Sequence, residues 1–192
     1  MIRQMIRLPF YRTLAAALCG LLAPVVMAQD ETPATVAQVD LKRYTGTWYE
    51  IAKIPNRFQD QCVGNTTASY QLRDDGRIDV INRCLDEDGE YDQAKGVARV
   101  VDSETNARLE VSFVSLLGWH LFWGDYWIIG LAEDYRYAVI GHPQREYGWI
   151  LSRQPQLTPS DRAHIDALLR NAGYDPQHFE ATPQDIAADA AG

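Results

Sequence analysis

The sequence is poor in the residues from which metal centres and active sites are commonly built, with only four histidines and three cysteines among 192 residues. The histidines are widely separated and follow no metal-ligand spacing. No serine lies in a G-x-S-x-G nucleophile elbow, and neither kind of glycine-rich loop that binds phosphate is present. We therefore expect a protein that is not an enzyme and that uses no metal and no cofactor.

Basic residues are also scarce, since 18 Lys and Arg stand against 26 Asp and Glu, for a formal charge of −8. A nucleic-acid-binding surface needs excess positive charge to displace counterions from phosphates, so the composition argues against a nucleic-acid partner. The acidic run from Asp86 to Asp92 resembles a calcium loop only weakly. It lacks the glycine at the sixth position and the acidic residue at the twelfth, which favours a solvated hairpin turn.

Long apolar runs are missing except near the N-terminus, where residues 14–27 are largely apolar and follow three arginines. This run of about 14 residues is too short to span a hydrocarbon core of ~30 Å. Residues 1–28 are predicted to be a secretory signal peptide cleaved after Ala28, which indicates a secreted or periplasmic protein. The alternative is an outer-membrane lipoprotein acylated at Cys19, but Leu18 occupies the position where lipoprotein processing uses Gly, Ala or Ser.

Removal of this signal leaves two cysteines, Cys62 and Cys84, and changes the formal charge to −11, because the segment contains three arginines and no acidic residue. An even pair in an oxidising compartment favours a disulfide, with two free buried thiols as the alternative. A hairpin turn at residues 74–76 would pair residues whose numbers sum to about 150. That register places Cys84 opposite residue 66, only a few positions from Cys62.

Eight strand-like runs alternate with turn signals from Gly46 onward, and no segment before residue 158 has the pattern of a long helix. The runs cover residues 46–54, 66–73, 77–84, 91–101, 108–114, 125–131, 135–141 and 147–153. Short connections rich in Asp, Asn and Gly join them, as is typical of antiparallel hairpins. The expected fold is all-β, an eight-stranded up-and-down antiparallel barrel, whose closure removes exposed sheet edges.

Residues 158–173 have the signature of a single amphipathic α-helix. Thr158 can cap it, Pro159 suits its first position and Gly173 can end it. Its apolar face is expected to pack on the outside of the barrel. Residues 29–40 and 181–192 are expected to be flexible, so the folded domain is expected to span residues 41–180.

Aromatic residues are frequent on the predicted strands. An eight-stranded barrel can be filled by its own side chains or can hold one small ligand, and aromatic residues suit both arrangements. Composition alone does not distinguish a plugged barrel from a cup.

The connection between residues 115 and 124 is apolar, although hairpin connections are normally polar. It carries Leu116, Leu117, Trp119, Phe122 and Trp123. At the rim of a barrel these side chains could form a lid, a ligand portal or a patch in transient contact with a membrane. The alternative is that they extend the strands and pack locally.

Three short motifs, in order along the chain, resemble those of lipocalins. Gly46-Thr47-Trp48-Tyr49-Glu50 resembles the G-x-W-Y signature of the first strand, and Asp134-Tyr135 resembles the second motif. Arg153 matches the third motif, in which an arginine covers the first-strand tryptophan at the closed end of the barrel. The resemblance covers about residues 41–180 and is greatest to the branch of bacterial lipocalins and apolipoprotein D.

This resemblance implies a cup that binds, and transports or stores, small hydrophobic or amphiphilic ligands such as fatty acids or lysophospholipids in the cell envelope. If Arg153 reaches Trp48, strand alternation directs Trp149 into the cup. Other residues expected at the ligand site are Tyr126, Phe113, Phe58, Tyr137 and Tyr70. A lipid-modifying enzyme and an envelope interaction module on the same barrel are the alternative functions.

Overall fold

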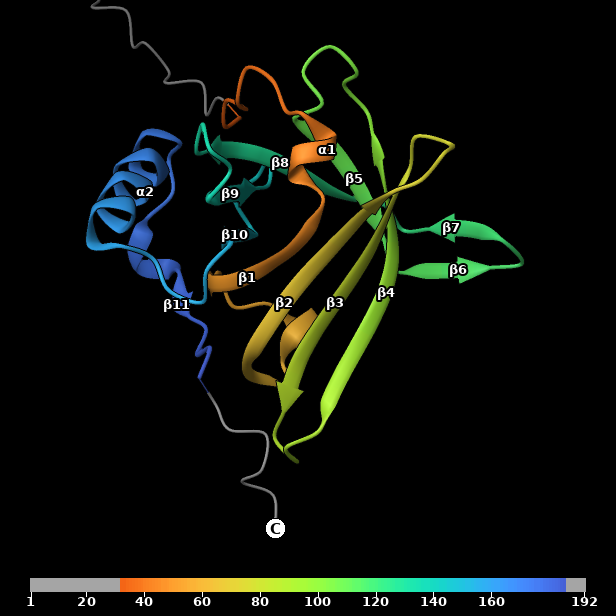
Figure 1. The fold of residues 1–192 in the computed structure, drawn as a ribbon, viewed down its shortest axis with the longest axis horizontal. Helices are drawn as coiled ribbons and strands as arrows, with labels where there is room; N and C mark the ends of the chain where they lie inside the picture. Colours follow the sequence, from red (N-terminus) through yellow and green to blue (C-terminus); the bar gives the residue numbers. More distant parts are fainter. Residues whose placement is uncertain (1–31, 186–192) are drawn as a thin grey trace, which may run out of the picture. The chain divides into compact units, whose positions relative to one another are not determined.

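Eight antiparallel strands pair in sequence order and close into a barrel (Figure 1). The computed structural model describes residues 32–185. The barrel strands are β1 (Gly46–Lys53), β2 (Cys62–Leu72), β3 (Ile78–Asp86), β4 (Tyr91–Val100), β5 (Arg108–Ser112), β8 (Gly124–Leu131), β9 (Tyr137–Gly141) and β10 (Gly148–Ser152). β10 pairs with both β9 and β1, which closes the ring and confirms the expected fold.

The hairpin of β2 and β3 has the predicted register, in which Ala68 pairs with Asn82 and the paired numbers sum to 150. Two irregularities between Cys62 and Thr67 change the pairing register of β2 with β3, so that Cys62 lies opposite Asp86. Strand β2 therefore begins earlier than the predicted run, because the irregular stretch still pairs with β3.

The predicted C-terminal helix is α2 (Pro159–Asn171), and the Thr158 side chain accepts a hydrogen bond from the backbone N–H of Asp161 at its first turn. Ile165 and Leu169 are fully buried against apolar residues of β8, β9 and β10. The helix thus covers the outside of the barrel, as its apolar face predicts. Arg136 of the barrel donates to the Asp161 carboxylate at 2.7 Å and lowers the pKa of that carboxyl.

One end of the barrel is closed by the short helix α1 (Leu41–Tyr44) and the side chains beneath it. The Arg153 guanidinium lies 3.7 Å from the centre of the fully buried Trp48 ring. It donates hydrogen bonds to the backbone carbonyls of residues 43, 44, 45 and 47. Gly46 has φ +92°, and a side chain there would approach the Arg153 guanidinium to 3.3 Å. Trp48 and Arg153 thus lie against each other at the closed end, the arrangement that the resemblance implies.

The second motif also lies at the closed end. The backbone N–H of Asp40 donates to the Tyr135 hydroxyl at 2.8 Å, and Arg43 lies over the Tyr135 ring. Asp134 accepts a hydrogen bond from Arg136, which lowers the pKa of its carboxyl. The motif therefore ties the chain before β1 to the connection between β8 and β9.

The segment before the barrel, residues 32–40, makes hydrogen bonds that its composition does not suggest. The backbone N–H of Val36 donates to Ile128, that of Val39 donates to Thr105, and Val39 is buried. The expected flexibility of this segment therefore does not agree with its hydrogen bonds after residue 35. The predicted signal peptide lies outside the described residues.

The C-terminal segment also differs from the expected tail. After the short 3₁₀ helix η2 (Pro176–His178), β11 (Glu180–Ala181) pairs with Ala52 and Lys53 of β1. The same two β1 residues pair with β10 on their other edge, so β11 lies on the edge of β1 that faces β2. Pairing of β1 with β2 ends at Tyr49. Residues 180–184 thus occupy the gap where β1 and β2 diverge, because that gap leaves backbone groups to be paired.

The connection between β5 and β8 forms a separate two-stranded sheet of β6 (Val114–Leu116) and β7 (Trp119–Leu121). This hairpin projects away from the barrel wall (Figure 1). Within residues 32–185, no helix is both long and apolar enough to cross a membrane.

Candidate functional site

The half of the barrel next to α1 is filled by side chains. Inward-facing residues from all eight barrel strands form one buried cluster, and Trp48 is fully buried within it. Other members of this cluster are Tyr44, Ala68, Tyr70, Ile78, Val80, Ala98, Leu109, Ile128, Ala138, Ile140 and Leu151. These side chains close this end of the barrel, so a ligand has to enter from the other end.

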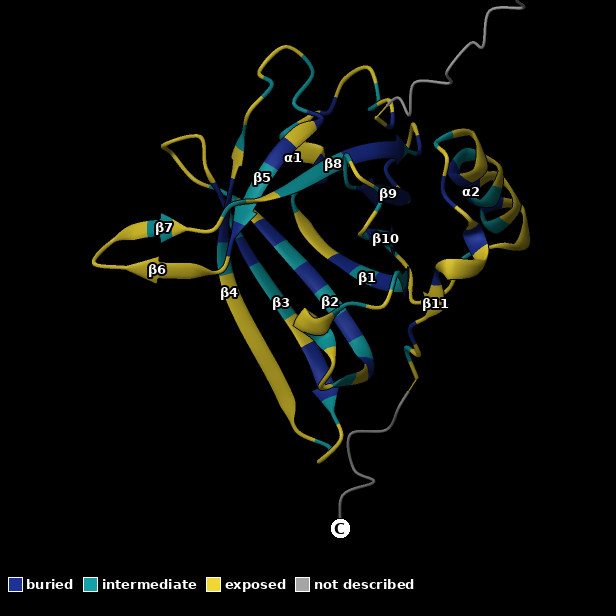
Figure 2. Ribbon diagram, turned by 180° about the vertical axis from the view of Figure 1, so that it is seen from behind, coloured by how far each residue is buried: buried dark blue, intermediate teal, exposed yellow. Residues whose placement is uncertain are grey.

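The inner wall becomes accessible toward the other end, which we call the open end. Along β5 the inward-facing positions pass from buried Leu109 to half-buried Val111, and the next alternate residue is Phe113, just after the strand, which is 41% exposed. Figure 2 shows the corresponding half of β4 as exposed along its length. Four residues of strand separate Leu109 from Phe113, a rise of ~13 Å. The accessible part of the inner wall extends over about this length, which favours a cup over a plugged barrel.

Small residues line one wall of the cup. Ala98 of β4 faces inward, so alternation directs Gly96 and Ala94 to the same face. The Phe113 ring covers Gly96, where an added Cβ would lie 2.7 Å from the ring. A glycine at position 96 therefore gives the Phe113 ring room to pack against the inner face of β4.

Three aromatic rings form a row on the opposite wall. Phe58, in the 3₁₀ helix η1 (Arg57–Gln59), contacts Tyr147 at 5.7 Å between ring centres, and Tyr147 stacks on Trp149 at 6.1 Å. Phe58 is 59% exposed, whereas Trp149 is partly buried against the inner cluster. The row leads from the open end into the cup, which supports the predicted positions of Trp149 and Phe58.

A polar chain holds Trp149 in place. Its indole N–H donates to Gln59 at 3.0 Å, and the Gln59 amide donates to the Glu50 carboxylate at 2.7 Å. Glu50 is 4% exposed. Its carboxylate also accepts a hydrogen bond from Thr182 and forms an ion pair with Lys53. The Glu50 carboxylate thus holds Gln59, which in turn holds the Trp149 side chain on the wall of the cup.

Tyrosine hydroxyls meet at the bottom of the cup. Tyr126 of β8 contacts the hydroxyl of Tyr44 at 2.7 Å and that of Tyr70 at 2.9 Å. Burial raises the pKa of all three tyrosines, that of Tyr70 to about 12. The structure therefore brings together Tyr126 and Tyr70, which were expected at the site, with Tyr44, which was not.

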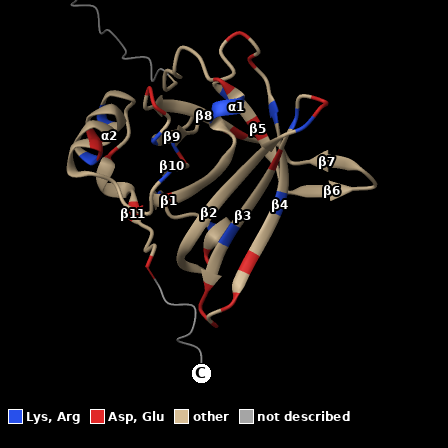
Figure 3. Cartoon of the chain, viewed as in Figure 1, with Lys and Arg blue, Asp and Glu red and all other residues tan. Residues whose placement is uncertain are grey.

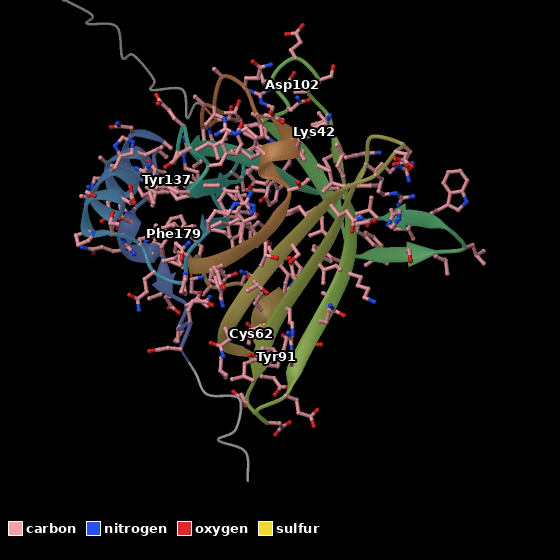
Figure 4. The ribbon with its side chains drawn as sticks, viewed as in Figure 1. Lys42, Cys62, Tyr91, Asp102, Tyr137 and Phe179 are labelled. Carbon is pink, nitrogen blue, oxygen red and sulfur yellow. A yellow bond between two sulfur atoms is a disulfide. The ribbon has the colours of Figure 1, made fainter. Side chains whose placement is uncertain are left out.

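The expected cavity position of Tyr137 is wrong. Its side chain belongs to the buried cluster between the barrel and α2, and its ring contacts His164 of that helix. Figure 4 shows Tyr137 near α2. Every residue of β9 is buried, on both faces of the strand. The sequence of β9 therefore lacks the polar–apolar alternation that would have distinguished its inner face.

Several residues of the site were missed by the sequence reasoning, namely Glu50, Gln59, Tyr147 and Tyr44. Glu50 could have been found, because alternation from Trp48 directs it inward and it follows the first motif directly. Gln59 and Tyr44 carry no such signal, because both lie outside the barrel strands.

The apolar connection is largely exposed. Leu116, Leu117, Trp119 and Phe122 are 62%, 92%, 75% and 82% exposed. Trp123 differs, because Arg99 lies 4.1 Å from its ring centre and covers it. No Lys, Arg, Asp or Glu colours the hairpin in Figure 3. Local packing therefore explains Trp123 but not the other four residues.

The predicted disulfide between Cys62 and Cys84 is present, with the two Cα atoms 5.6 Å apart. Figure 4 places Cys62 at the end of β2 far from α1. The bond ties the irregular start of β2 to β3 at the open end.

The part of the chain that the structure describes contains no group of three or more His, Cys, Asp or Glu side chains suited to a metal ion. The arrangement is that of an eight-stranded cup, closed at one end and lined by small and aromatic side chains at the other. A family model described as "Lipocalin-like domain" matches residues 39–184. The chain belongs to the lipocalin family.

Relatives cover most of the chain. "Outer membrane lipoprotein Blc" of Escherichia coli (strain K12) is 38% identical over 160 residues, which are 81% of this chain and 87% of that protein. "Apolipoprotein D" of Mus musculus is 34% identical over 162 residues, 80% of this chain and 81% of that protein. The solved structure of insecticyanin from the tobacco hornworm Manduca sexta has a TM-score of 0.65 at 23% identity, covering 85% of this chain and 87% of that one.

Proposed function

We propose that this protein binds, and carries or stores, a small hydrophobic or amphiphilic lipid such as a fatty acid or lysophospholipid in the cell envelope. The observation that carries the proposal is an inner wall that is apolar and becomes accessible away from Trp48. Membership in the lipocalin family supports it. Burial of about ten methylenes at ~0.8 kcal/mol each contributes about 8 kcal/mol, comparable to a micromolar complex. An acyl chain with more methylenes would also offset the loss of translational and rotational freedom on binding.

Titration with oleate and oleoyl-lysophosphatidylcholine tests this function. We expect Trp149→Ala to weaken binding about tenfold, which corresponds to loss of ~50 Å² of apolar contact. Trp127→Ala is the matched control, because Trp127 packs with the cluster outside the barrel. Solvent extraction of the natively purified protein followed by mass spectrometry would identify a resident lipid. Absence of binding by the wild-type protein would contradict the proposal.

We propose that the chain is exported and cleaved after Ala28, giving a periplasmic or secreted carrier. The E. coli relative is described as an outer membrane lipoprotein, which makes acylation at Cys19 the competing outcome. The intact mass of the mature protein distinguishes the two, because cleavage before Gln29 removes Cys19 and an acylated protein retains it.

The exposed β6–β7 hairpin supports a second role, transient contact with a membrane. Four large apolar side chains with no charged neighbour in β6 or β7 are costly to leave in water. The charge of −11 after signal removal would repel an anionic surface. We therefore expect association with neutral phosphatidylcholine vesicles that falls when anionic lipid is added.

Co-sedimentation with such vesicles tests the hairpin. Trp119→Ser with Phe122→Ser should reduce association several-fold, whereas Val101→Ser, which alters an exposed residue at the closed end, should not. Equal association of all three proteins would exclude the hairpin. We expect no turnover of lysophospholipid esters, because the cup contains no nucleophile with a neighbouring base among its described residues. Hydrolysis by the purified protein would favour the enzymatic alternative.

A further inference from the structure

The hydroxyls of Tyr44, Tyr126 and Tyr70 do not satisfy one another completely. Tyr126 lies between the other two, so the group contains two oxygen–oxygen contacts, at 2.7 and 2.9 Å. Three hydroxyls carry three protons, and two contacts use only two of them. One O–H donor of this triad is therefore left over, whichever way the hydrogen bonds run.

No other described residue accepts that proton. Each of the three hydroxyls hydrogen-bonds only within the triad, although Glu50 is close enough to influence Tyr70 electrostatically. The Glu50 carboxylate is itself engaged by Gln59, Thr182 and Lys53. A buried donor without an acceptor costs about 1–3 kcal/mol, so such groups normally meet a water or ligand atom.

The triad lies where a ligand in the cup would end. Tyr126 pairs with Leu109, the residue at which the inner wall of β5 becomes fully buried. Tyr126 as a whole is half-buried, whereas Tyr44 and Tyr70 are buried. Tyr126 therefore packs against the edge of the buried inner cluster, and its hydroxyl contacts two of that cluster's tyrosines.

The surroundings disfavour a charged partner. All three tyrosine hydroxyls are buried, so a negative charge there would be poorly solvated, and burial accordingly raises the pKa of each tyrosine. Arg153 acts electrostatically on Tyr44 and Tyr70, but its guanidinium is occupied by four backbone carbonyls and the Trp48 ring. A carboxylate or phosphate at the triad would therefore lose its hydration without gaining a counterion.

We propose that the Tyr44–Tyr126–Tyr70 triad is a recognition site for the uncharged carbonyl oxygen of a ketone, aldehyde or ester, which enters the cup with its oxygen-bearing end first. The carbonyl accepts the third hydroxyl proton, and the alkyl chain extends past Phe113 and Trp149 toward the open end. This inference rests on the proposed lipid-binding function. It adds a preferred ligand class and orientation, opposite to that of a lysophospholipid, whose charged headgroup must stay at the open end.

A pair of isosteric probes tests the site. Dodecan-2-one and 2-methyldodec-1-ene differ only in an oxygen replaced by a methylene group, and displacement of a fluorescent fatty acid measures both. We expect the ratio of ketone to alkene affinity to fall about three- to ten-fold in the Tyr44→Phe/Tyr70→Phe/Tyr126→Phe variant, the loss of one hydrogen bond. Tyr137→Phe, outside the barrel, is the matched control and should leave the ratio unchanged.

Infrared spectroscopy of the wild-type complex gives an independent readout that needs no variant. The ¹³C-labelled carbonyl of bound dodecan-2-one should absorb at a lower frequency than in hexane, as hydrogen-bonded ketones do. A hexane-like frequency, or an unchanged affinity ratio in the triple variant, would overturn the triad as a carbonyl site while leaving lipid binding intact. Failure of ketone, alkene and oleate alike to bind would overturn both the proposed function and this inference.

Discussion

The hydroxyl of Thr182 donates a 2.7 Å hydrogen bond to the buried carboxylate of Glu50, which lies 132 positions earlier in the chain. Neighbouring residues extend this link. Gln184 donates to the carbonyls of Glu50 and Thr66, and Pro183 accepts from the backbone of Asn65. The C-terminal segment therefore joins β1 to β2 where the two strands no longer pair. Through Glu50 and Gln59 it also reaches Trp149 on the wall of the cup.

Removal of the C-terminal segment should destabilise the barrel. A chain that ends at Phe179 loses the hydrogen bonds of residues 180–184, and we expect a loss of about 2–4 kcal/mol in the free energy of unfolding. Urea unfolding measures this. A chain that ends at Asp185 retains those bonds and should match the full protein. Equal stability of both truncated chains would show that the segment does not hold β1 and β2 together.

Loss of the disulfide should lower stability without changing the barrel. Cys62 and Cys84 are separated by 22 positions, and opening a loop of this size costs about 3 kcal/mol through the entropy of the unfolded chain. Cys62→Ser with Cys84→Ser should therefore unfold at lower urea, with or without reductant. The wild-type protein in reductant should behave like this double variant. Unfolding of the wild type that does not respond to reductant would contradict the prediction.

Arg153→Lys should destabilise the closed end despite the retained charge. A lysine ammonium has three donors and cannot reproduce the planar fork that reaches four carbonyls while covering Trp48. We expect a loss of about 2–4 kcal/mol in thermal or urea unfolding. Arg162→Lys, in a partly exposed pair with Asp166 within α2, is the control and should cost under about 0.5 kcal/mol. Similar losses for the two variants would contradict this role of Arg153.

Alkaline pH should lower the stability of the protein through the tyrosine triad. The pKa of Tyr70 is raised to about 12 by burial, whereas unfolded tyrosine titrates near 10. The unfolded chain therefore loses this proton first, and stability is constant below pH 10 and falls between pH 10 and 12 by about 1 kcal/mol per pH unit. Urea unfolding at pH 9, 10 and 11, with tyrosinate absorbance, measures it. The triple Phe variant should show a weaker fall, and an identical pH profile would contradict the assignment.

The predictions from sequence succeeded where local pattern carries the information. The turn at residues 74–76 set the register of β2 and β3, and Thr158 and Pro159 marked the start of α2. The prediction for Tyr137 was wrong because β9 is buried on both faces, so its sequence has no polar–apolar alternation to indicate which side chains face inward. The order of residues 181–184 was missed because small and polar residues hold their place through partners on β1 and β2, not through apolar burial.

Strand alternation, turn residues and three motifs thus determine a lipocalin barrel with a disulfide and one covering helix, since each of these depends on neighbouring residues or on one hairpin. Only the tertiary structure decides that the barrel is a cup, that residues 180–184 occupy the gap between β1 and β2, and that three tyrosine hydroxyls meet with one proton left over. These features join residues that are 56 to 132 positions apart. Such contacts depend on how strands curve and diverge in space, which no local spacing in the sequence records.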